Sequence, residues 1–328
     1  MPTVAFFSEC SYLLILLYQS SRHRSDDPSS KGEIFMTNTN CKLPYILVAD
    51  DFSVESRAAA DAALQIARIQ DLTIEGLYVV EEVLALDTYA NYHAELSVLS
   101  NGSNDNSREP TSRAELVKWF ENQGKVALNW LETEGTEAGV PVTTKLLAGG
   151  VSQLVLRDAA QARLLAIGRR GHSHKDNSES LGHNFRKIAH HAHLPMLVGG
   201  RKTPALHRLL LAYHGQAHAD DALTWTAMLQ RNLSAEVLVL SVRDDTESSQ
   251  NGVSLEEIKE KLAHSDLTDY RFLTGQDKPA AEMANVAAAN DVDLIILGHY
   301  RHSALVEWLV GSTVDRLLRA TSLPVLIA

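Results

Sequence analysis

Short apolar runs recur along the chain and alternate with stretches of helical periodicity. Residues 45–51 (YILVADD) and 208–214 (RLLLAYH) are apolar runs that end in polar residues, the pattern of a strand buried on both faces. Similar runs follow each of them: TIEGLYVV, VTTKLLA, RLLAIG and LPMLVGG after the first, and SAEVLVLSV, YRFLTG, DLIILG and LPVLIA after the second. Between the runs, the spacing predicts helices at 53–70, 113–134, 151–161, 218–232, 255–264 and 279–290.

This alternation determines the expected fold class. A β-α-β-α-β-α-β-α-β order needs crossovers between parallel strands, so it predicts an α/β fold with helices on both faces of a sheet. We expect two tandem doubly wound domains, each with a five-stranded parallel sheet, at residues 41–201 and 205–328. The Gly-Gly-Arg-Lys-Thr-Pro segment at 199–204 is typical of a domain boundary, and an insertion near 84–110 lengthens the first domain.

The two halves are copies of one unit. QARLLAIGRRGHS, beginning at Gln161, matches DVDLIILGHYRHS, beginning at Asp291. A second glycine follows 14 positions after the first in one copy and 13 positions after it in the other, and each second glycine is followed 12 positions later by Leu-Pro. One inserted residue in the first copy explains the offset. The sequence therefore predicts an internal repeat.

Length and composition favour a protein of the cytoplasm. A chain of 328 residues suits two domains, since a single core rarely grows much past ~250 residues. The net charge of -11 and the scattered basic residues argue against partnership with nucleic acid or an anionic membrane. Cys10 and Cys41 have no metal-binding spacing and do not suggest a secreted disulfide fold.

The first 40 residues differ from the rest. The apolar run SYLLILLY at 11–18 is shorter than the ~20 residues of a membrane span. A signal peptide would need basic residues before its apolar run, but no Lys or Arg precedes Arg22. Met36 stands just before the first convincing strand. We expect residues 1–40 to be a disordered or artefactual extension, with an uncleaved anchor or weak signal as the alternative.

The best candidate for chemistry follows the fourth strand of the second copy. Ligands of an open parallel sheet bind at the carboxyl ends of its strands, and this strand ends at Gly298. Gly311, Ser312 and Thr313 open the next helix, whose N-terminal N–H groups favour phosphate. Arg301 could reach the same phosphates through charge-assisted hydrogen bonds.

Here the chain resembles the universal stress proteins. That family carries a nucleotide motif Gly-x2-Gly-x9-Gly-Ser/Thr, and Gly298-x2-Arg301-x9-Gly311-Ser312-Thr313 is similar to it except for Arg301 in place of a glycine. The resemblance covers both copies and implies the adenine nucleotide α-hydrolase-like fold. In the family, an aspartate after the first strand lies near the ribose, and a valine late in the second strand presents its backbone to adenine. The positions that match these two roles are Asp51 and Val79 in the first domain, and His214 and Val242 in the second.

The two copies depart from the motif in complementary ways. The first keeps Asp51, Gly168 and Gly171, but Gly182 follows after ten residues and precedes His183-Asn184 rather than hydroxyl residues. The second keeps the phosphate half and has His214, which can still hydrogen-bond a ribose hydroxyl. The resemblance therefore implies ATP or another adenine nucleotide as the ligand, favoured in the second domain, and Mg²⁺ could accompany it.

Each feature also has a plainer interpretation. Gly-Ser-Thr before a helix is an ordinary N-cap in most proteins, and Asp51 could be a turn residue or helix cap. Six histidines fall within 22 residues, at 172, 174, 183, 190, 191 and 193. His190 and His191 would point about 100° apart on a helix, and no carboxylate or cysteine completes a known spacing. We therefore predict no metal site there.

Three functions fit the sequence. The first is a nucleotide-binding stress-response sensor or regulator, and the second is a nucleotide-free scaffold that acts through an unknown protein partner. The third is a slow ATP hydrolase, although no Walker A, dinucleotide or nucleophile-elbow motif is present and no catalytic residue stands out. Because single-domain members of the family pair through their last strand, LPMLV and LPVLI are expected to pair within the chain as a pseudo-dimer. Two chains could then form a homodimer.

Overall fold

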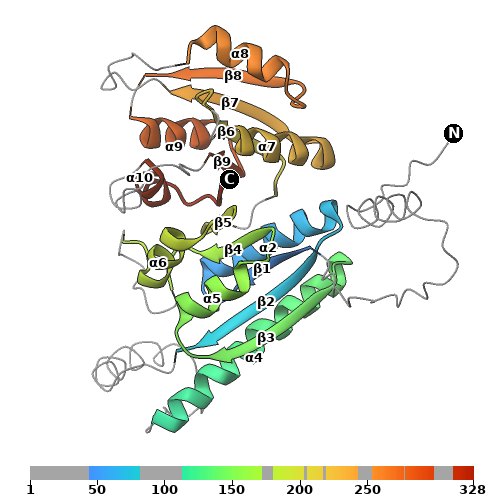
Figure 1. Ribbon diagram of the computed structural model, residues 1–328, viewed down its shortest axis with the longest axis vertical. Helices are drawn as coiled ribbons and strands as arrows, with labels where there is room; N and C mark the ends of the chain where they lie inside the picture. Colours follow the sequence, from blue (N-terminus) through green and yellow to red (C-terminus); the bar gives the residue numbers. More distant parts are fainter. Residues whose placement is uncertain are drawn as a thin grey trace, which may run out of the picture. The chain divides into compact units, whose positions relative to one another are not determined.

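The computed structural model describes residues 44–81, 113–171, 180–202, 205–216, 219–242, 253–276, 278–298 and 313–328 (Figure 1). The predictions for residues 1–40 and for the insertion at 84–110 lie outside these residues. Contacts group Pro44–Ala328 as one unit, so the predicted boundaries 41–201 and 205–328 stay a prediction. Among the described residues, no helix combines the length and the apolar character that crossing a membrane requires.

The first domain has a parallel sheet of five strands in the order β3-β2-β1-β4-β5. Each strand follows one of the apolar runs, because a strand covered on both faces must be apolar on both. The strands are β1 (Tyr45–Ala49), β2 (Thr73–Val80), β3 (Val142–Ala148), β4 (Leu164–Gly168) and β5 (Met196–Gly199).

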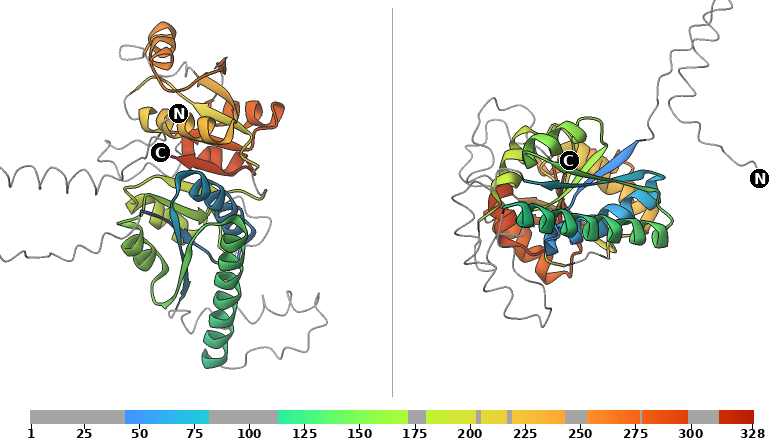
Figure 2. Two further views of the ribbon diagram at one scale, coloured as in Figure 1. Left: turned by 90° about the vertical axis from the view of Figure 1, so that its right-hand side faces the viewer. Right: turned by 90° about the horizontal axis from the view of Figure 1, so that it is seen from below.

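Four described helices cover the two faces of this sheet: α2 (Val54–Gln70), α4 (Arg113–Ala138), α5 (Val151–Ala159) and α6 (His183–His191). Helix α2 begins because Ser53 Oγ accepts the Ser56 N–H at 3.1 Å, and it ends at Asp71, whose φ is 52°. Helices α2 and α4 pack side by side on one face, and α5 and α6 lie on the other (Figures 1 and 2). Helix α4 extends beyond the predicted end at 134, to Ala138, where Gly139 with φ 70° ends it.

The second domain repeats the arrangement with the strand order β8-β7-β6-β9-β10, again all parallel. Its strands are β6 (Arg208–Ala212), β7 (Glu236–Val242), β8 (Tyr270–Gly275), β9 (Leu294–Leu297) and β10 (Val325–Ile327). Its described helices are α7 (Asp220–Leu233), α8 (Leu255–Ala263), α9 (Pro279–Ala289) and α10 (Thr313–Ala320). The predicted internal repeat is therefore confirmed at the level of topology.

The two sheets join through their last strands. Strand β10 runs antiparallel to β5, with Val325 opposite Val198 and Ile327 opposite Met196. The result is one sheet of ten strands, in the order β3-β2-β1-β4-β5-β10-β9-β6-β7-β8. The expected pairing of LPMLV with LPVLI is confirmed, and it covers the edge that each last strand would otherwise expose.

Candidate functional site

The candidate site of the first domain lies where the strand order reverses, between β1 and β4. The chain leaves β1 for α2 on one face of the sheet and leaves β4 toward α6 on the other face. Asp51 follows β1, and Gly168 ends β4. The carboxyl ends of neighbouring parallel strands open a crevice at such a reversal, which is the usual ligand position in this kind of sheet.

The loop after β1 is held in shape by Asp50, a residue that the sequence did not single out. The Asp50 side chain is buried, and its Oδ1 accepts the Phe52 N–H at 2.8 Å and the Ser56 hydroxyl at 2.6 Å. Its Oδ2 is buried with no hydrogen-bond partner, and Arg57 Nε lies 3.8 Å away. The backbone turns through Phe52, whose φ is 69°. Asp50 therefore fixes the loop that presents Asp51.

Arg57 is held by aromatic rings next to this loop. Its guanidinium lies 3.8 Å from the centre of the Trp130 ring and 4.8 Å from that of Phe52. Burial lowers the pKa of Arg57, while the charge of Asp50 opposes that shift. The cation is thus kept close to the Asp50 carboxylate through stacking as well as through charge.

Asp51 has the electrostatic character of a partly buried acid. Burial raises the pKa of Asp51, while hydrogen bonds from Ser53 oppose the shift. The Ser53 N–H lies 3.1 Å from Asp51 Oδ1. A carboxylate in this setting has spare acceptor capacity, and the hydroxyl of a ligand could use it.

Three of the predicted glycines come together beside Asp51. A methyl group added to Gly171 would lie 3.5 Å from Asp51 Oδ2, so the loop after β4 passes within contact of the carboxylate. A methyl group on Gly182 would lie 3.4 Å from the nitrogen of Gly171, and Gly182 N–H donates to the Arg169 carbonyl at 3.0 Å. A methyl group on Gly168 would lie 2.9 Å from the Ser56 nitrogen, so the start of α2 packs directly on this strand.

Val79 lies at the same end of the sheet as these residues. The Asp50 N–H bonds the Leu77 carbonyl at 3.0 Å, and Val79 is two residues further along β2. The structure thus places all five predicted residues of the first domain at one end of the sheet: Asp51, Val79, Gly168, Gly171 and Gly182.

The second domain is only partly described at the equivalent position. His214 follows β6, Gly298 follows the neighbouring strand β9, Val242 ends β7, and Thr313 begins α10. The other three predicted residues, Arg301, Gly311 and Ser312, lie outside the described residues.

Tyr213 stands where Asp50 stands in the first domain. It is buried, and its hydroxyl donates to Asp220 Oδ1 at 2.7 Å. Burial and the neighbouring Asp220 raise the pKa of Tyr213, so the phenol stays protonated at neutral pH.

Arg169 is a buried charged residue beside the candidate site that sequence reasoning missed. It follows β4 directly, and only 2% of its surface is exposed. Its guanidinium donates to the Gly199 carbonyl at 2.8 Å, to those of Leu318 and Thr321 at 2.6 Å each, and to that of Leu323. Burial lowers the pKa of Arg169 to about 10, so the group remains charged at neutral pH. The available signal was an arginine placed directly after a fully buried strand.

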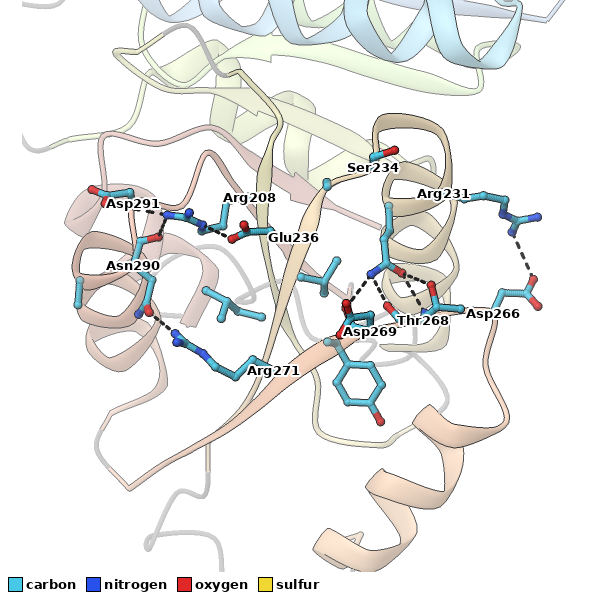
Figure 3. A pocket seen from close by; sticks show the side chains of 16 residues that line it. Arg208, Arg231, Ser234, Glu236, Asp266, Thr268, Asp269, Arg271, Asn290 and Asp291 are labelled. Atoms are coloured by element: carbon cyan, nitrogen blue, oxygen red, sulfur yellow. Dashed lines mark hydrogen bonds and ion pairs between the residues drawn. The ribbon is translucent and has the colours of Figure 1, made fainter.

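A cavity of about 1120 Å³ lies at the opposite end of the second domain's sheet (Figure 3). It is lined by the residues that begin β6, β7 and β8 and by the ends of α7 and α9. Several of its charged groups pair with one another: Arg208 Nε lies 2.9 Å from Glu236 Oε2, and Arg231 lies 3.5 Å from Asp266. The lining of this cavity does not identify a ligand.

The histidine cluster is only partly described. His190 and His191 lie with their ring centres 4.7 Å apart at an interplanar angle of 84°. No group of three or more metal-binding side chains occurs among the described residues. His172 and His174 lie outside them.

Comparison with known proteins gives a consistent result. A sequence model described as "Universal stress protein family" matches residues 44–198 and 205–328. Universal stress protein Slr1230 from Synechocystis sp. is 26% identical over 166 residues, which is 50% of this chain and 56% of that protein. The match thus spans little more than half the length of this relative.

Two solved structures share the fold over most of both chains. A universal stress protein from Archaeoglobus fulgidus has a TM-score of 0.64 and 14% identity, covering 87% of this chain and 95% of that one. A putative universal stress protein from Pseudomonas aeruginosa has a TM-score of 0.56 and 15% identity, covering 87% and 93%. At such identities the likeness is one of fold alone.

Proposed function

The chain belongs to the universal stress protein family, and on this premise we propose that it binds an adenine nucleotide and acts as a stress-response sensor or regulator. ATP is the favoured nucleotide, and the second domain is the favoured site. The observation that carries the proposal is that described motif residues lie where the strand order reverses in each copy: Asp51, Gly168 and Gly171 in the first, and His214 and Gly298 in the second.

The second domain offers the better phosphate site. Helix α10 begins at Thr313, so Ser312 and Thr313 would supply hydroxyl groups beside the free N–H groups of the first turn. Arg301 would add a charge-assisted hydrogen bond, and Mg²⁺ could share the phosphate oxygens. His214, which follows β6, would contact the ribose. Val242, which ends β7, would contact the adenine.

The first domain is the weaker site. Asp51 would accept a hydrogen bond from a ribose hydroxyl. The loop after β4 passes close to Asp51 at Gly171, so it would contact the same ligand. The Gly182 N–H, however, already donates to Arg169, and His183 and Asn184 begin α6 in place of hydroxyl residues. Fewer donors are therefore left for phosphate, and we expect the first domain to bind ATP more weakly than the second.

A nucleotide-free scaffold is the second candidate. The bond from Gly182 to Arg169 favours it, because it closes the first domain's loop on itself without a ligand. A slow ATP hydrolase is a third reading of the same site, but no pair of side chains among the described residues suggests a base and a nucleophile there.

Calorimetric titration with ATP of the wild-type chain and three variants tests the proposal. Ser312→Ala should weaken binding by about fivefold to tenfold, since one hydrogen bond to phosphate is lost, and Gly311→Val should abolish it. Asp51→Ala, in the first domain, serves as the matched control and should leave the affinity of the tighter site unchanged. Loss of binding in Asp51→Ala alone would put the nucleotide in the first domain. No heat with the wild-type chain would favour the scaffold.

A further inference from the structure

The Arg169 side chain crosses from the first domain to the end of a helix in the second. Three of its four carbonyl partners, those of Leu318, Thr321 and Leu323, belong to the last turn of α10 and the turn that follows it. The last carbonyls of a helix have no partner within the helix and carry partial negative charge, so a cation is stabilised there. Arg169 therefore caps α10 from another domain.

The backbone segments around this cap are tightly packed against each other. A methyl group added to Gly200 would lie 2.2 Å from the Ser322 carbonyl oxygen and 2.7 Å from the Pro324 nitrogen. The Arg201 N–H donates to the Ser322 carbonyl at 2.8 Å. The guanidinium thus lies beside two closely packed backbone segments, 199–201 and 321–324. A displacement of Arg169 must therefore move these segments as well.

The other end of Arg169 belongs to the candidate ligand loop of the first domain. Its backbone lies between Gly168, which packs on the start of α2, and Gly171, which lies beside Asp51. Its carbonyl accepts the Gly182 N–H that begins α6. A change of shape at Asp51 and Gly171 therefore moves a residue whose side chain is bonded to α10.

Helix α10 is short, so a displacement of its C-terminal end should move the whole helix. It has 8 residues, and it leads from Thr313 at one end to the carbonyls that Arg169 holds at the other. By the internal repeat, the position of Arg169 corresponds to His299 in the second domain. In sequence, then, the arginine is present in one copy of the repeat and absent from the other.

We propose that Arg169 couples the conformation of the 168–171 loop in the first domain to the order of α10 in the second. A change at the contact between Asp51 and Gly171 is transmitted through the guanidinium to the C-terminal end of α10, and so to Thr313 at its start. The coupling is a property of the chain itself and goes beyond the proposed nucleotide binding. Because coupling is reciprocal, a change in α10 also acts on the loop.

Hydrogen exchange of the full-length, nucleotide-free chain, measured on peptides covering 313–321, tests this coupling by a double-mutant cycle. Gly171→Val places two further methyl groups beyond a Cβ that already contacts Asp51 Oδ2 at 3.5 Å, and so is expected to disturb the loop, and Arg169→Met removes the guanidinium. With Arg169 present, Gly171→Val should speed exchange in α10 by about fivefold or more. With Arg169→Met, the same change should have less than about a twofold effect, which is the non-additivity expected of coupled residues.

Two further variants keep the outcome interpretable. Arg163→Met removes an exposed arginine at the other end of β4 and should leave the effect of Gly171→Val intact. Arg169→Lys keeps the charge but cannot satisfy four carbonyls at once, and it should give an intermediate result even if Arg169→Met fails to fold. An equal effect of Gly171→Val with and without the arginine, or no effect on α10 in the wild-type background, would overturn the proposal. A purely structural Arg169 would produce that additive result.

Discussion

The loops after β1 and β6 occupy the same place in two copies of one fold, yet they are stabilised by different side chains. The backbone is shared: the Asp50 N–H bonds the Leu77 carbonyl at 3.0 Å, and the Tyr213 N–H bonds that of Leu240 at the same distance. Asp50 then ties its loop together through Phe52 and Ser56, whereas Tyr213 reaches Asp220 in α7. The duplicated fold preserves the path of the backbone and leaves the ligand chemistry free to diverge.

The residue two positions further along each loop extends the comparison. Phe52 and Gly215 both have positive φ, 69° and 78° respectively. A methyl group on Gly215 would lie 2.8 Å from side-chain atoms of Ile258 in α8 and of Val253 just before it, so this part of the chain covers the second loop closely. In the first domain the Phe52 ring contacts Arg57 instead. The side chains over the two candidate sites therefore differ in kind as well as in sequence.

The largest effect is expected where a helix meets the last strand of each domain. In Gly199→Ala the new methyl would lie 1.8 Å from the Glu55 carbonyl oxygen, so α2 must move off β5. We expect a loss of about 3 kcal/mol in the free energy of unfolding, measured by urea denaturation. The matched position in the second domain is Ala328, which is buried and already carries a methyl group. Ala328→Gly should cost only about 1 kcal/mol, and equal losses in the two variants would remove this difference between the domains.

A smaller effect is expected from the residues that hold the two loops. Asp50→Ala leaves the Phe52 N–H without its acceptor and the Ser56 hydroxyl with the Ser53 carbonyl alone, and should cost about 2 kcal/mol. Tyr213→Phe removes one hydrogen bond and should cost about 1 kcal/mol. Thermal denaturation of both variants measures the difference. A larger loss of stability in Tyr213→Phe than in Asp50→Ala would contradict this order. It would mean that the loop after β6 depends more on its polar contact than the loop after β1 does.

Acid should destabilise the first domain through an ionic network whose two strand positions are leucines in the second domain. Burial raises the pKa of Asp158, but hydrogen bonds from Arg157 and Lys145 outweigh it, so the pKa lies below its ordinary value of 3.8. Such a group contributes stability above pH 3.8 that is lost as the pH falls through its folded pKa. Lys145 also bonds Glu75. The strand register aligns Lys145 with Leu273 of the second domain and Glu75 with Leu238, so these two charges have no counterpart there.

Hydrogen exchange or circular dichroism between about pH 5 and pH 3 tests this dependence. The first domain of the wild-type chain should lose protection before the second. Asp158→Asn should flatten that dependence, because the amide does not titrate. An identical acid response in the two proteins would contradict the role of Asp158.

The smallest effect is expected at Asp51. Because burial raises its pKa, the ionised carboxylate is unfavourable in the folded chain, and its cost is present above its ordinary pKa. Asp51→Asn should therefore raise the melting temperature slightly at pH 7 and leave it unchanged at low pH, where the carboxyl is protonated. A lower melting temperature at pH 7 would show that the charge stabilises the loop.

Apolar periodicity was enough to predict the strands and their order along the chain, and the matching segments and glycine spacings predicted the internal repeat. The inner strands are buried on both faces, which leaves a continuous apolar run that local sequence displays, whereas the edge strands β3 and β8 are only partly buried and carry polar residues. The pairing of β5 with β10 was predicted from the family resemblance rather than from the residues, since both strands are simply apolar.

The parts that sequence reasoning missed are long-range polar contacts. Arg169 bonds carbonyls about 150 positions away in the chain, and a carbonyl leaves no mark on the identity of its residue. Asp50 was overlooked because the resemblance pointed to its neighbour, Asp51, although Asp50 makes the stronger local contacts. Gly199 and Gly200 were interpreted as a linker, while they are needed for close packing between backbones.

The central claim is that the chain holds an adenine nucleotide, and the most direct test is to identify what it carries when purified. The protein would be isolated gently and denatured, and the released small molecules would be identified and counted by mass spectrometry. We predict about one adenine nucleotide per chain, and a clear loss from Ser312→Ala but not from Asp51→Ala. Release of no nucleotide from the wild-type chain, together with no heat on titration with ATP, would contradict the claim and favour a scaffold.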